Sequence, residues 1–127
     1  LYETEAYREA QQIGAQALYF LNWLHYYGAR LYDGAKRKQW LDQAQQGFSE
    51  FAGGDEQSEL TVESLLGRGL CALDAGELGA AIDDLKRVAD SRQASPERRE
   101  KARLALLDAY VRRESTEAAL RLSEELL

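Results

Sequence analysis

Apolar residues recur at every third or fourth position along most of the chain, which predicts α-helices with one apolar face each. Within residues 3–32 we expect either one long helix or two helices with a kink near Gly14. The recurring apolar residues there are Ala6, Ala10, Ile13, Ala17, Leu21, Leu24 and Leu31. Further helices are predicted at 35–52, 59–75 and 78–88, a fifth opened by Pro96 and a sixth capped by Ser115. The glycines of Asp33-Gly34, Gly53-Gly54 and Gly76 separate the first four. No segment alternates as a strand does, so the predicted fold class is all-α.

Three segments of similar sequence indicate that the helices form repeated hairpins. They are residues 40–48, 76–85 and 116–127, and aligning Ala44, Ala81 and Ala119 places the copies 37 and 38 residues apart. Recurrence at this length is typical of stacked helix pairs, because one pair cannot bury its apolar face alone. We therefore predict a single domain over residues 1–127, with antiparallel hairpins at 1–54, 55–92 and 93–127 in a short right-handed α-solenoid. The chain has no methionine and begins at Leu1, so we expect it to be a piece of a longer protein.

Small residues in the second half of the chain carry a family resemblance. Gly69 precedes Gly76 by seven residues, and an apolar run follows at Leu78, Ala81, Ile82, Leu85 and Val88. A second run of apolar and small residues occurs at 106–110, followed by Ala118-Ala119-Leu120. The pattern resembles that of the tetratricopeptide repeat family, most closely over residues 59–127. The resemblance implies stacked helix pairs and a protein-interaction scaffold with a concave groove.

Composition and charge narrow the expected partners. Apolar residues make up 45% of the chain and charged residues 30%, with a net charge of −6. An acidic balance argues against nucleic acid as a partner, because phosphate binding needs a cationic face. Residues 10–29 carry no formal charge, but their glutamine, asparagine and histidine side chains argue against a transmembrane segment.

The residues that could carry chemistry favour a structural interpretation. Cys71 is the single cysteine, which excludes a disulfide framework, and its apolar surroundings predict a buried, inert thiol. His25 is the single histidine and lies in no recognisable catalytic motif. Gly67-Arg68-Gly69 lies within a helix, where close helix packing explains it, and Asp83-Asp84 is expected on a solvated face. We therefore predict no enzyme activity, no metal site and no cofactor.

Aromatic residues suggest where a partner would bind. Nine of the 12 lie between Tyr19 and Phe51, and Tyr19, Trp23, Tyr26 and Arg30 fall on one helical stripe. Tyrosine, tryptophan and arginine are favoured interface anchors. The candidate partner-binding residues are Tyr19, Trp23, Tyr26, Tyr27 and Arg30. Two interpretations stay open for them, since the cluster serves either as core or as an exposed groove.

The predicted function is a non-catalytic scaffold that binds a peptide or partner helix of another protein in a concave groove. One alternative is self-association, with an end-to-end contact in a homodimer through Leu122, Leu126 and Leu127 at the apolar end of the last helix. Another is the regulatory helical domain of a larger enzyme, with a small-molecule pocket lined by Trp23, Tyr27 and Trp40.

Overall fold

The structure, a computed structural model, describes residues 4–55 and 57–126, without the side chains of residues 118, 119, 122, 123, 125 and 126. These residues form five helices: α1 (Glu5–Ala29), α2 (Gly34–Ala52), α3 (Glu59–Asp74), α4 (Leu78–Ala89) and α5 (Pro96–Leu126). No strand occurs within the described ranges. The predicted all-α fold class is confirmed.

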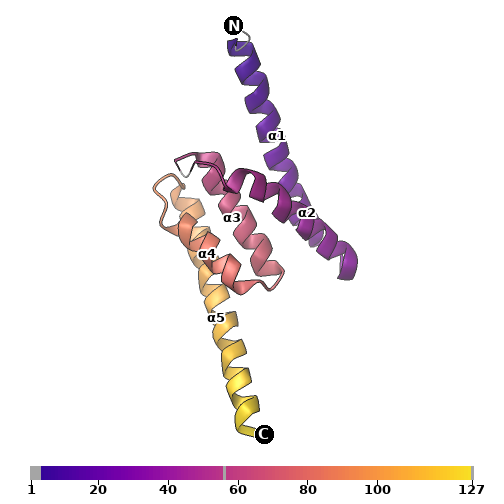
Figure 1. The fold of residues 1–127 in the computed structure, drawn as a ribbon, viewed down its shortest axis with the longest axis vertical. Helices are drawn as coiled ribbons and strands as arrows, with labels where there is room; N and C mark the ends of the chain where they lie inside the picture. Colours follow the sequence, from indigo (N-terminus) through magenta and orange to yellow (C-terminus); the bar gives the residue numbers. More distant parts are fainter. Residues whose placement is uncertain (1–3, 56, 127) are drawn as a thin grey trace.

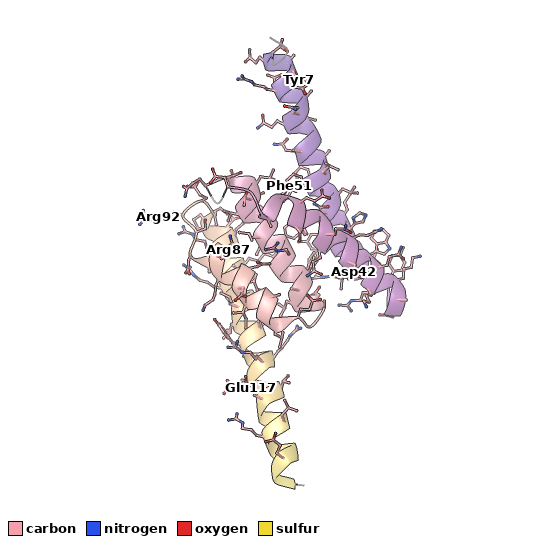
Figure 2. All side chains as sticks on the ribbon, viewed as in Figure 1. Tyr7, Asp42, Phe51, Arg87, Arg92 and Glu117 are labelled. Atoms are coloured by element: carbon pink, nitrogen blue, oxygen red, sulfur yellow. The ribbon has the colours of Figure 1, made fainter. Side chains whose placement is uncertain are left out.

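Each helix packs against the next one along the chain, and α3 also contacts α1 and α5. Figure 1 shows α3 in the middle of the packed region, with the first half of α1 and the second half of α5 projecting from it in opposite directions. Tyr7 and Glu117 mark these two projections (Figure 2). The core therefore sits around α3, in which most side chains are buried.

Small residues allow close packing where helices cross. A Cβ atom built on Gly67 would lie 2.4 Å from Cζ of Phe48, and one built on Gly69 would lie 2.9 Å from Cγ of Leu85. Ala81 of α4 is fully buried. The interpretation of Gly67-Arg68-Gly69 as a packing element is therefore confirmed.

Replacing Gly67 by alanine is expected to destabilise the fold by about 1–3 kcal/mol, because the added methyl group overlaps the buried Phe48 ring. The matched control is Gly79→Ala in α4, where an added Cβ meets nothing within 4 Å. This substitution is expected to be neutral or to stabilise the fold by up to ~1 kcal/mol, because alanine has a higher helix propensity than glycine. Urea denaturation followed by circular dichroism measures both effects. Equal stability of the two variants would contradict the packing at Gly67.

Two sequence expectations are wrong. The break predicted at Ser115 does not exist, and one 31-residue helix, α5, replaces the predicted fifth and sixth. Residues 112–117 contain neither glycine nor proline, and the Thr116 hydroxyl donates to the backbone carbonyl of Arg112 at 2.9 Å inside the helix. The pair Asp83-Asp84 is not wholly solvated either, because Asp84 is buried against Arg68.

Candidate interaction site on the first helix

The helix α1 has two apolar faces, one in its second half and one along nearly its whole length. One face, here called the inner face, packs on the rest of the molecule and consists of Tyr19, Asn22, Trp23, Tyr26 and Ala29. The other, here called the outer face, consists of Ala6, Ala10, Ile13, Ala17, Phe20, Leu24 and Tyr27, continued by Leu31 in the turn just after the helix, all of them exposed. An α-helix advances about 100° per residue, which puts the centres of these two sets on roughly opposite sides. The two faces therefore serve different purposes.

The inner face is an aromatic cluster with Trp23 at its centre. The ring centroid of Trp23 lies 4.9 Å from that of Phe48 of α2, and 5.8 Å from that of Tyr26. Tyr19 also contacts Phe48, at 6.3 Å between centroids. Edge-on contacts of this kind add to the stabilisation that burial provides. The cluster holds α1 against α2 and α3.

The structure divides the predicted partner-binding residues into two groups. Tyr19 and Tyr26 belong to the core, and burial raises the pKa of Tyr26 to about 12 and that of Tyr19 also. Both phenols are therefore neutral at physiological pH. Trp23 is half-buried, while Tyr27 and Arg30 are exposed at the edge of the cluster.

Cations already occupy the exposed edge of the aromatic cluster. The Arg30 guanidinium donates to the Tyr26 hydroxyl at 2.8 Å and lies 5.1 Å from its ring centroid. Nζ of Lys101, on α5, donates to the Tyr27 hydroxyl at 3.4 Å and lies 5.8 Å from the Trp23 ring centroid. Such cation–π contacts contribute about 0.5–1 kcal/mol each at exposed sites. The Lys101 contacts therefore link this edge of α1 to α5.

A hollow of about 380 Å³ lies between the middle of α1 and the start of α3. Its lining includes Gln16, Tyr19 and Phe20 on one side and Glu59 and Glu63 on the other. Arg98 of α5 lies 2.6 Å from a carboxylate oxygen of Glu63 and 3.4 Å from one of Glu59. The single guanidinium of Arg98 therefore bridges the two carboxylates.

The structure does not bring Trp23, Tyr27 and Trp40 together around a pocket. Trp40 packs against His25 and Tyr32, with ring centroids 5.3 Å and 5.6 Å away, and covers Gly28. Within the described part of the chain, no ring contact joins Trp40 to Trp23 or Tyr27.

The outer face is the feature that sequence reasoning missed. Its large aliphatic and phenylalanine side chains, Ile13, Phe20, Leu24 and Leu31, are between 61% and 80% exposed, and Tyr27 is 46% exposed. The helical periodicity of the segment predicts a helix but does not by itself identify this face. The sequence feature that identifies this face is the regular spacing of its apolar residues, which alternates between four and three residues from Ala6 to Leu31 without a break. An average of 3.5 residues is the period of a coiled-coil seam, in which one helix packs along another.

The apolar end of the last helix stays a prediction. The backbone of Leu122 and Leu126 belongs to α5, but their side chains lie outside the described residues, and so does the whole of Leu127. Earlier in α5, Leu104, Leu107 and Val111 are exposed.

The remaining candidate residues are engaged in the fold. Cys71 is fully buried, as predicted, and burial raises the pKa of its thiol to about 12. The His25 ring packs edge-on against Trp40.

Within residues 4–55 and 57–126, no three His, Cys, Asp or Glu side chains are grouped as metal ligands would be. None of the helices described has both the length and the apolar character needed to cross a membrane.

Comparison of the chain with protein-family models, with curated proteins and with solved structures finds no match. The resemblance to the tetratricopeptide repeat family therefore stays a prediction.

Proposed function

We propose that the chain is a non-catalytic protein-interaction module that binds a helix of its partner along the outer face of α1. The observation that carries this proposal is the exposed row of apolar side chains from Ala6 to Leu31. Contiguous apolar surface of this extent normally marks an interaction site, because its exposure to water is unfavourable. The 3.5-residue period favours a helix as the occupant.

We also propose that the helices stack as a short α-solenoid of the tetratricopeptide type. The contacts that link α1 to α3 and α3 to α5 support it, because alternate helices of a solenoid lie side by side in one layer. In such a stack the concave face would lie over α3. That face is narrowed by the Lys101 contact to Tyr27 and by the Arg98 contacts to Glu59 and Glu63. Of the outer face of α1, only Tyr27 shares in these contacts, while Ile13, Phe20 and Leu24 are 61% to 65% exposed, which favours this face over the groove as the binding surface.

The proposal can be tested by photo-cross-linking in cells that produce the protein. The photoreactive residue p-benzoyl-phenylalanine is introduced at position 24, in the middle of the outer face. Position 104 is the matched control, because Leu104 of α5 is 63% exposed and Leu24 is 65% exposed. We expect discrete covalent adducts from position 24 that disappear when Phe20→Glu is added, and none of them from position 104. Absence of any such adduct from position 24 would contradict the proposed function.

A further inference from the structure

We propose that the occupant of the outer face is the outer face of a second copy, so that two α1 helices pair antiparallel about a two-fold axis. This inference rests on the proposed function and names its partner. Four features of α1 support it: the length of the outer face, here also called the seam, the sizes of the residues that would face each other, one glycine and one pair of opposite charges.

The seam has the length that a coiled coil needs. Within α1 the outer face runs from Ala6 to Tyr27, about three heptads, and the 25 residues of α1 span about 37 Å. Three to four uninterrupted heptads are the usual sign of a coiled coil. A two-fold pairing also uses the same surface on both copies, as closed dimers do.

An antiparallel pair matches large side chains with small ones in nearly every layer. We place the two-fold axis between residues 18 and 19 of each copy. The facing pairs are then Ala6 with Leu31, Ala10 with Tyr27, Ala17 with Phe20, and Ile13 with Leu24 of the second copy. Three of the four layers therefore combine an alanine with a large side chain, which packs two helices closely at nearly constant separation. A parallel pair would place alanine on alanine at one end and Leu31 on Leu31 at the other. The distribution of sizes along α1 therefore favours the antiparallel arrangement.

Gly14 provides an independent observation. It lies inside α1, where glycine destabilises a helix by about 1 kcal/mol relative to alanine. A Cβ built on Gly14 would meet nothing within 4 Å, so packing inside its own chain does not require a glycine there. Gly14 directly follows Ile13 of the outer face, and in the antiparallel register it faces Leu21 of the second copy. Close packing of the second helix against this position would explain why a glycine occurs there.

Two opposite charges flank the seam on the same side. Glu9 directly precedes Ala10, and Arg30 directly precedes Leu31. In an antiparallel coiled coil the same flanks of the two helices face each other, so Glu9 of each copy lies near Arg30 of the other. In a parallel pair these two residues would lie at opposite ends of the interface.

The shape of the molecule leaves room for the second copy. The first half of α1 projects beyond the packed region, while its second half is attached to α2 and α3 (Figure 1). An antiparallel pair lays the projecting half of each copy along the attached half of the other. Each copy thereby covers the exposed apolar face of its neighbour.

Sedimentation equilibrium of the 127-residue chain tests the inference. We expect the wild type to be a dimer and Leu24→Glu to raise the dimer dissociation constant at least ~100-fold, because the side chain occurs twice in the interface. The control Leu104→Glu, on an equally exposed leucine of α5, should stay within about threefold of the wild type. Circular dichroism checks that both variants stay helical, which is expected because both side chains are exposed in the single chain.

Charge exchange at low salt tests the antiparallel orientation. Glu9→Arg and Arg30→Glu should each weaken the dimer about 3–30-fold, and combining them should restore it to within about threefold. Additive effects without restoration would overturn the antiparallel arrangement. A wild type that stays monomeric, or that Leu24→Glu does not dissociate, would overturn pairing through α1. Adducts of another protein at position 24, with a monomeric wild type, would overturn the second copy as partner and leave the proposed function standing.

Discussion

Replacing Phe48 by alanine is expected to lower the free energy of unfolding by about 3–5 kcal/mol. The ring is fully buried at the meeting point of three helices, where it contacts Trp23 of α1 and covers Gly67 of α3. Its removal leaves a cavity that neither the half-buried indole nor the glycine can fill. Since small domains are stable by only about 5–15 kcal/mol, the variant should unfold at markedly lower urea concentration. Urea denaturation followed by circular dichroism measures the loss.

The matched control is Phe51→Ala, one turn further along α2 (Figure 2). Phe51 is only partly buried, so its removal exposes less new cavity surface. We expect less than half the loss found for Phe48→Ala. Equal losses would mean that the crossing of α1, α2 and α3 is not centred on Phe48.

The extents of most helices could be predicted because local signals set them. The predicted ranges 35–52, 59–75 and 78–88 differ from α2, α3 and α4 by no more than one residue at either end. Gly34 and Gly76 adopt the left-handed conformation, with φ of 63° and 80°, where glycine is least strained. The hydroxyl of Ser95 accepts from the backbone N–H of Arg98 in the first turn of α5. These features depend on neighbours in the sequence alone.

The choice between the two apolar faces of α1 could not be predicted, because it depends on the helices that pack against it. Both faces have helical periodicity, and the inner one is richer in aromatic residues while the outer one is mainly aliphatic. The structure buries the aromatic one because α2 offers space for it: a Cβ on Gly47 would overlap the Asn22 side chain, and the Phe48 ring lies directly beside Trp23. No pattern within α1 encodes the positions of Gly47 and Phe48. Sequence reasoning therefore found the candidate residues but could not say which of them reach solvent.

The adjacent acids Asp83 and Asp84 show the same limit for charges. Neighbours on a helix point about 100° apart, which led to the prediction of a solvated face. In the structure Asp83 is exposed, whereas Asp84 is only 7% exposed. Its two carboxylate oxygens accept from Nε and Nη2 of Arg68 at 2.7 Å and 2.9 Å. The partner lies 16 residues earlier, on α3, so only the packing of α3 on α4 reveals the pair.

Asp84→Ala is therefore expected to cost about 2–4 kcal/mol, while Asp83→Ala should stay within about 0.5 kcal/mol of the wild type. Removing the buried carboxylate leaves the guanidinium of Arg68 without its bidentate partner in a largely desolvated position. The loss falls toward the lower end of that range because the Arg68 side chain is 26% exposed and water can reach part of it. Thermal and urea denaturation of the two single variants compare neighbouring residues of identical chemistry.

Arg68→Ala combined with Asp84→Ala should cost less than the sum of the single changes by about 1–3 kcal/mol, since the second change no longer leaves a charge without its partner. Strictly additive losses would show that the two side chains do not interact in solution, and equal losses at positions 83 and 84 would contradict the burial of Asp84.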